Sequence, residues 1–187
     1  MGLISKASRR VLQRRYETAA GAGDADAMLY IATVRAQDDP AASREWFRRA
    51  AEAGNVHAMY IVGLYLEPHA PEPSRAWLER AADSGHVDAM IKLGVLDQPT
   101  DERAARRRYE QAAELGSAIA MFNLGLLTEG RDRASASAWY ERAAEAGDAD
   151  AMVKLARLAE PRDPQAAQTW WEKAAAAEHP AAQERLG

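Results

Sequence analysis

The sequence contains no cysteine, which excludes a disulfide framework and thiolate-bound zinc and is typical of a reducing compartment. No apolar run approaches the roughly 18 residues of a membrane span. The first ten residues lack the hydrophobic core of a signal peptide. The net charge of −4 gives no general reason to bind nucleic acid. We therefore expect a soluble, cytoplasmic protein with no membrane segment and no nucleic-acid partner.

Signatures of catalysis and metal binding are also scarce. The four histidines do not stand four residues from a second histidine or a carboxylate in a metal-binding arrangement. No nucleophile elbow, phosphate-binding loop or pair of catalytic carboxylates is recognisable. The sequence thus predicts a protein that is not an enzyme, with no catalytic residue, no cofactor and no metal.

What the sequence does contain is a repeat of 31 residues. An aromatic residue or leucine precedes an Ala-Ala pair six times without an insertion, and each occurrence lies 31 residues after the previous one. These markers are Tyr16, Phe47, Leu78, Tyr109, Tyr140 and Trp171. The chain 1–187 therefore reads as one domain of six repeats, which we number 1 to 6: 1–37, 38–68, 69–99, 100–130, 131–161 and 162–187.

Each repeat reads as two helices joined by a tight turn. In the first helix, apolar residues such as Ala136, Tyr140 and Ala143 recur at helical spacing. A column of aspartates stands where an N-cap is needed, and a column of glycines stands where the helix must end. These columns are Asp39, Asp101, Asp132 and Asp163, and Gly23, Gly54, Gly85, Gly116 and Gly147.

The second helix is apolar on most of its circumference, so more than one neighbour must bury it. Ala120, Leu124 and Leu127 form one stripe, and Met121 and Phe122 belong to another. One repeat alone cannot cover both stripes, and stacking of successive repeats is therefore obligatory. We predict an all-α solenoid of six helical hairpins, with about twelve antiparallel helices.

The pattern W-Y-x-x-A-A-E-x-G-x-x-D-A-x-x-x-L-G-x-L resembles the Sel1-like repeat, a relative of the tetratricopeptide repeat. Residues 138–152 and 120–127 carry the resemblance most clearly. The period is shorter than is usual in the family, because the glycine-rich loop between repeats is missing. The resemblance implies a right-handed α–α superhelix that acts as a non-catalytic scaffold or adaptor for a protein or peptide partner.

The resemblance also places partner binding on a concave surface lined by the first helices. The residues we select there are Trp46, Arg49, Trp77, Arg80, Arg107, Trp139 and Arg142. The tryptophan column has an alternative explanation, which is packing between repeats. The charged face around Glu45 and Arg49 also has an alternative explanation, which is a solvated surface with ion pairs four residues apart. The alternative function is a structural, self-associating module. We expect a monomer or a weak homo-oligomer.

Two basic clusters and one apolar column complete the candidates. The clusters are Lys6, Arg9, Arg10, Arg14 and Arg15, and Arg103, Arg106, Arg107 and Arg108. A membrane or nucleic-acid patch is possible for the first, but an acidic peptide meeting Arg106 and Arg107 is favoured. On the second helices, Ile61 and Leu64 and, in repeat 4, Ile119 and Leu126 form either an exposed contact patch or part of the buried core.

Overall fold

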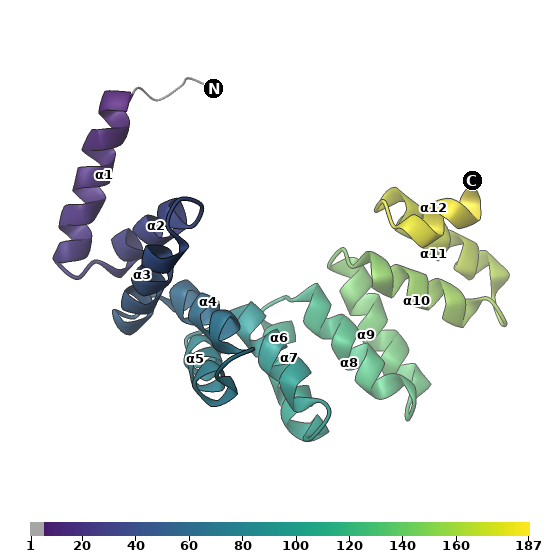
Figure 1. Cartoon of the computed structure of the whole chain (residues 1–187). Helices are drawn as coiled ribbons and strands as arrows, with labels where there is room; N and C mark the ends of the chain where they lie inside the picture. Colours follow the sequence, from purple (N-terminus) through teal and green to yellow (C-terminus); the bar gives the residue numbers. More distant parts are fainter. Residues whose placement is uncertain (1–5) are drawn as a thin grey trace. The chain divides into compact units, whose positions relative to one another are not determined.

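The computed structural model describes residues 6–187, with side chains from Val11 onward. Within this range it contains twelve α-helices and no strand (Figure 1), which confirms the predicted all-α chain of helical hairpins. The helices are α1 (Lys6–Gly21), α2 (Ala25–Arg35), α3 (Pro40–Glu52), α4 (Val56–Leu66), α5 (Pro71–Asp83), α6 (Val87–Asp97), α7 (Glu102–Glu114), α8 (Ala118–Glu129), α9 (Arg133–Glu145), α10 (Ala149–Ala159), α11 (Pro164–Ala176) and α12 (Pro180–Leu186). The side chains of Lys6, Arg9 and Arg10, from the first basic cluster, lie outside the described residues.

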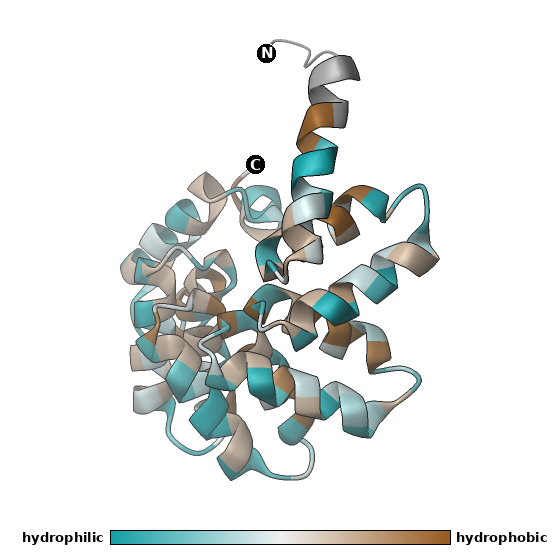
Figure 2. Cartoon of the chain, turned by 90° about the vertical axis from the view of Figure 1, so that its left-hand side faces the viewer, coloured by the Kyte–Doolittle hydropathy of each residue, from teal (hydrophilic) through white to brown (hydrophobic). Residues whose placement is uncertain are grey.

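The helices group into two compact units, which we call unit 1 (Met1–Ala89) and unit 2 (Met90–Gly187). Within unit 1, α2 packs on α3 and α4 packs on α5. Within unit 2, α8 packs on α9 and α10 packs on α11. In each of these pairs the second helix of one repeat meets the first helix of the next, as the two apolar stripes predicted. Connections between helices carry mainly hydrophilic residues (Figure 2).

The predicted helix ends are confirmed. Asp39 accepts a hydrogen bond from the Ala42 amide at 3.0 Å, and Asp148 accepts one from the Ala151 amide at 2.8 Å. The five column glycines have φ between 86° and 99°, a region that other residues adopt only with strain. In repeat 6 that position is Glu178, which takes a φ of 61°. The hairpin turn is therefore imposed on Glu178 by its surroundings.

Successive repeats approach closely at one buried contact, between the marker side chain and the preceding second helix. In unit 1, Leu78 is fully buried against Gly63, where an added Cβ would lie 2.7 Å from the Leu78 Cγ. In unit 2, Tyr140 is fully buried against Gly125 in the same way. At these two contacts, glycine on the second helix makes room for the larger side chain of the next repeat.

Candidate partner-binding site

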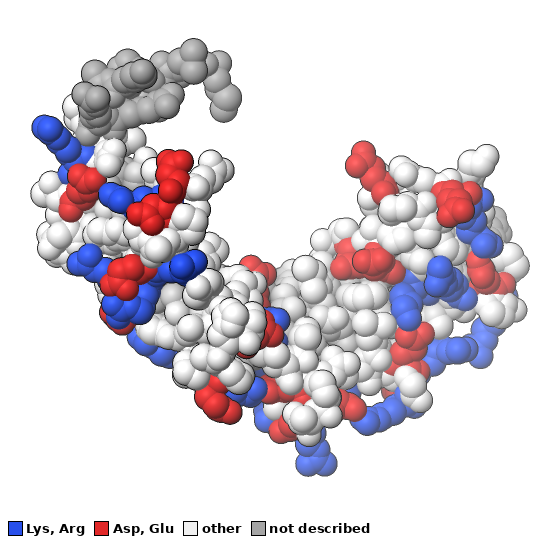
Figure 3. All heavy atoms as spheres, viewed as in Figure 1, with Lys and Arg blue, Asp and Glu red and all other residues white. Residues whose placement is uncertain are grey.

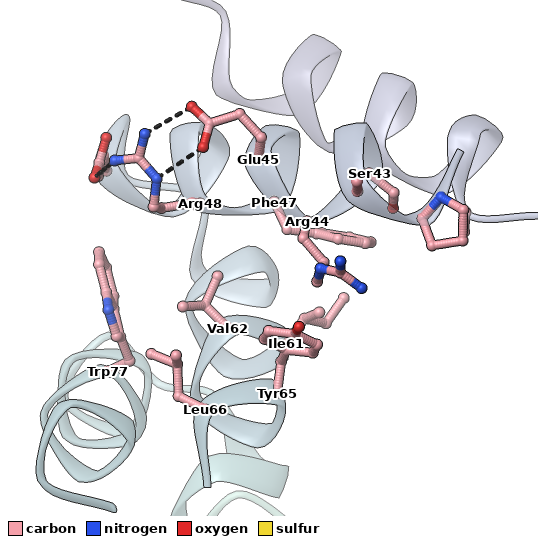
Figure 4. A pocket seen from close by; sticks show the side chains of 14 residues that line it. Ser43, Arg44, Glu45, Phe47, Arg48, Ile61, Val62, Tyr65, Leu66 and Trp77 are labelled. Atoms are coloured by element: carbon pink, nitrogen blue, oxygen red, sulfur yellow. Dashed lines mark hydrogen bonds and ion pairs between the residues drawn. The ribbon is translucent and has the colours of Figure 1, made fainter. Parts of the chain in front are cut away.

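A cavity of about 520 Å³ opens in unit 1, between α3, α4 and α5 (Figure 4). Its wall is largely apolar. Phe47 comes from α3, Ile61, Val62, Tyr65 and Leu66 come from α4, and Trp77 comes from α5. We call this cavity the α3–α5 pocket. Because regular helices carry all of these side chains, the pocket is formed before any partner arrives.

Two arginines line the pocket, and they differ in their partners. Arg48 binds both oxygens of Glu45, at 2.6 and 3.0 Å, and also pairs with Glu52. The hydrogen bond from Arg48 lowers the pKa of Glu45. Arg44 instead lies over the ring of Tyr65, with its Cζ 5.2 Å from the ring centre. The charge of Arg48 is thus balanced within the chain, whereas the contact of Arg44 is with an aromatic ring.

The side chain at position 47 differs from its counterparts in repeats 4 to 6 in its ability to form a hydrogen bond. In repeats 4 to 6 the marker side chain donates a hydrogen bond to the residue eleven positions earlier. These bonds join Tyr109 to Gln98 at 3.2 Å, Tyr140 to Glu129 at 2.9 Å, and Trp171 to Glu160 at 3.0 Å. In repeat 2, Phe47 has no donor and Ala36, eleven residues earlier, has no acceptor. Both polar groups are replaced together, and Phe47 and Ala36 line the pocket instead.

The corresponding place in unit 2 holds a three-residue contact, Glu129, Tyr140 and Lys154, which we call the polar triad. The Lys154 ammonium lies 2.9 Å from Glu129 and 5.9 Å from the centre of the Tyr140 ring. The hydrogen bond from Lys154 lowers the pKa of Glu129, and burial raises the pKa of Tyr140. In repeat 2, Ile61 occupies the position of Lys154. An aliphatic side chain there leaves the pocket wall apolar.

Six of the seven predicted site residues form three stacked pairs. Each tryptophan is half-buried, and the arginine three residues later lies over its ring. The distances from Cζ to the ring centre are 4.4 Å for Arg49 on Trp46, 4.2 Å for Arg80 on Trp77, and 4.4 Å for Arg142 on Trp139. The pairing of Glu45 with Arg49 is wrong, because Glu45 binds Arg48 while Arg49 stacks on Trp46.

The structure places the predicted residues unequally with respect to the pocket. Trp77 lines it. Trp46 is on α3 in the same unit but is not among the lining residues, and Trp139 belongs to unit 2. Arg107 is exposed on α7 and falls outside the stacked-arginine column, since the repeat 4 residue at that position is Gln111. Of the seven residues selected from the sequence, one therefore lines the pocket.

Sequence reasoning missed Phe47, Tyr65, Leu66 and Arg44. A usable signal was present, because Phe47 and Ala36 break the donor–acceptor pattern of the later repeats together. For the apolar column of the second helices, the sequence left open an exposed contact patch or a part of the buried core, and its members differ. Ile61 is half-buried in the pocket wall, whereas Ile119 and Leu126 are 55% and 40% exposed.

Histidines and charges give no competing site in the described part of the chain. His57 Nδ1 lies 3.2 Å from His86 Nε2. The two histidines are 29 residues apart and belong to successive repeats, and the sequence did not predict this contact. Among the described residues, no group of three histidines or carboxylates is placed to hold a metal ion, and no helix is long and apolar enough to span a membrane. On the face in Figure 3, acidic and basic side chains of the described residues are interspersed.

Comparison with solved structures finds the same architecture. A Sel1 repeat protein from Oxalobacter formigenes is 24% identical, with a TM-score of 0.78 over 93% of this chain and 88% of that chain. A protective antigen of uropathogenic Escherichia coli with an SLR fold is 26% identical, with a TM-score of 0.75 over 88% of this chain. The present chain spans only 40% of that antigen. An immunity protein from Pseudomonas aeruginosa, 17% identical, has a TM-score of 0.58 over 90% of this chain and 74% of that chain.

Among curated protein sequences, none matches this chain. The Sel1 repeat matches five consecutive segments, at residues 33–55, 56–86, 87–117, 118–148 and 149–179. These segments follow one another without a gap and cover well over half of the sequence. The chain therefore belongs to the Sel1 repeat family.

Proposed function

We propose that this chain is a non-catalytic interaction module that binds a partner protein by accepting a large apolar side chain of that partner in the α3–α5 pocket. Sel1 repeat proteins generally mediate protein–protein interactions, which supports the class of function. The observation that carries the proposal is the open apolar pocket of about 520 Å³ in unit 1. Its volume falls within the roughly 300–1,000 Å³ of ordinary ligand pockets.

The energetics favour an aromatic or large aliphatic anchor. Complete burial of such a side chain contributes about 1.5–3 kcal/mol. A few anchors of this kind dominate most protein interfaces. The lining residues lie on helices, so binding orders few groups that were free before. A single side chain in this pocket is therefore able to supply a large share of the binding free energy.

The remaining predicted residues are further candidate contacts, each within its own unit. In unit 1, Trp46 with Arg49 presents a half-buried stacked pair. In unit 2, Trp139 with Arg142 presents a pair of the same type, and Arg107 offers an exposed cation. In this proposal the protein acts in the cytoplasm, as a monomer or weak homo-oligomer, without a cofactor.

A peptide-display selection tests the proposal. The wild-type chain is the target, and the variant A36E/F47Y/I61K, which copies the polar triad to the equivalent positions of unit 1, is the counter-target. We expect selected peptides to share a large apolar residue and to bind the variant at least about tenfold more weakly, because roughly 1.4 kcal/mol of apolar burial is lost. Circular dichroism checks that the variant is folded. Peptides that bind both proteins equally would show that the pocket is not the binding site.

A further inference from the structure

Arg44 lines the pocket and has no carboxylate within ion-pair distance among the described residues. The other lining arginine, Arg48, is held by Glu45 and Glu52. Both rim carboxylates are in turn satisfied by Arg48. The two arginines and two glutamates of the lining sum to zero formal charge, and Arg44 is the one of the two arginines that has no carboxylate of the described residues at ion-pair distance.

The contact between Arg44 and Tyr65 keeps the donors of Arg44 available. The guanidinium lies over the Tyr65 ring at 5.2 Å, where the attraction is to the face of the ring (Figure 4). The N–H donors of a guanidinium lie in its own plane and form a fork that fits a carboxylate. The contact with the ring uses none of these donors. Arg44 is thus positioned for a charge-assisted hydrogen bond to a bound partner.

We infer that the segment bound in the α3–α5 pocket carries an acidic side chain close to its apolar anchor, and that this carboxylate binds Arg44. The inference rests on the proposed function and specifies the chemistry of the partner. The anchor lies among Phe47, Ile61 and Trp77, and the acidic group lies on the Tyr65 side of the pocket. A basic residue at the same point in the partner would be repelled by Arg44.

Matched synthetic peptides test this inference on the full chain. Each peptide carries one tryptophan and one glutamate at a defined position near it, and each has a twin in which glutamine replaces the glutamate. Binding is followed by NMR through the indole N–H of Trp77 in the pocket, with the indole N–H of Trp171 in unit 2, which donates to Glu160, as an internal control. We expect one glutamate position to bind about two- to fivefold more tightly than its glutamine twin, the range of an exposed ion pair.

The variants Arg44→Gln and Arg35→Gln separate the possible outcomes. Arg35 belongs to the same unit, pairs with Glu17 and does not line the pocket. Arg44→Gln should abolish the preference for glutamate, and Arg35→Gln should preserve it. If every glutamate peptide and its twin bind equally to the wild type, the inference is wrong while the pocket remains a binding site. If no peptide shifts the Trp77 signal, the proposed function itself fails.

Discussion

The junction of repeats 4 and 5 and the junction of repeats 1 and 2 have different side chains at the same three positions. The first has the polar triad of Glu129, Tyr140 and Lys154, joined by two contacts of 2.9 Å. At the equivalent positions the pocket in unit 1 has Ala36, Phe47 and Ile61. The backbone is a helical hairpin in both cases. On the same backbone, three side chains thus decide whether the junction of two repeats holds a polar contact or an apolar pocket.

The largest difference in stability between the two units is expected at the buried contact beneath the marker side chain. Gly125 lies against Tyr140 with no room for a Cβ, whereas Ala32, its counterpart in unit 1, is fully buried with its Cβ in place. Gly125→Ala should therefore destabilise the protein by about 2–3 kcal/mol through overpacking. Ala32→Gly should cost about 1 kcal/mol. Chemical denaturation measures both, and equal effects would show that the two contacts are equivalent.

A second difference concerns the Tyr140 hydroxyl and the Glu129 carboxylate, which are both replaced by apolar groups at Phe47 and Ala36. Glu129→Ala leaves the hydroxyl of the buried Tyr140 without its acceptor, and we expect a loss of about 1–3 kcal/mol. Adding Tyr140→Phe recreates the combination found at Ala36 and Phe47 and should restore most of that loss. The measurement is a double-mutant cycle by urea denaturation. A double variant less stable than Glu129→Ala alone would contradict the coupling.

The triad should also give unit 2 a dependence on pH that Ala36, Phe47 and Ile61, at the equivalent positions of unit 1, cannot give. Hydrogen bonding to Lys154 lowers the pKa of Glu129 below its ordinary value of 4.5. Because the folded-state pKa is the lower one, this stabilisation is present above about pH 4.5 and is lost as the pH falls through the folded value. Denaturation at pH 6 and pH 3.5 should show a smaller pH effect in E129A/Y140F than in the wild type. Identical pH effects would remove Glu129 as a cause.

The smallest difference is expected at the stacked pairs, where the two units agree. Arg49 on Trp46 and Arg142 on Trp139 have the same 4.4 Å separation. Replacing either arginine by alanine should cost about 0.5–1 kcal/mol, the size of an exposed cation–π contact. Thermal denaturation of both variants provides the check. A clearly larger loss at one of them would mean that its arginine has a further structural role.

The fold was predictable because local signals recur in register along the chain. An aspartate such as Asp39 caps a helix through its own side chain, and a glycine such as Gly147 takes a positive φ wherever the turn requires it. Both effects depend on near neighbours in the chain. The pocket was not predicted, and of the residues selected from the sequence only Trp77 lines it, because its other walls come from α3 and α4, and their separation from α5 is not a local property. Arg107 was chosen for its charge, and it lies outside the column of stacked arginines.

By itself the sequence determined the twelve-helix repeat architecture, the helix ends and the turns, since periodicity and capping act within a few residues. Tertiary structure decided what each position does once repeats are stacked. Contacts between residues 11 to 29 positions apart bring Tyr140 to Glu129 and His57 to His86, and the absence of such a polar pair opens the space beside Phe47. Packing of neighbouring helices sets these distances, and a residue's own segment does not encode which side chain will face it.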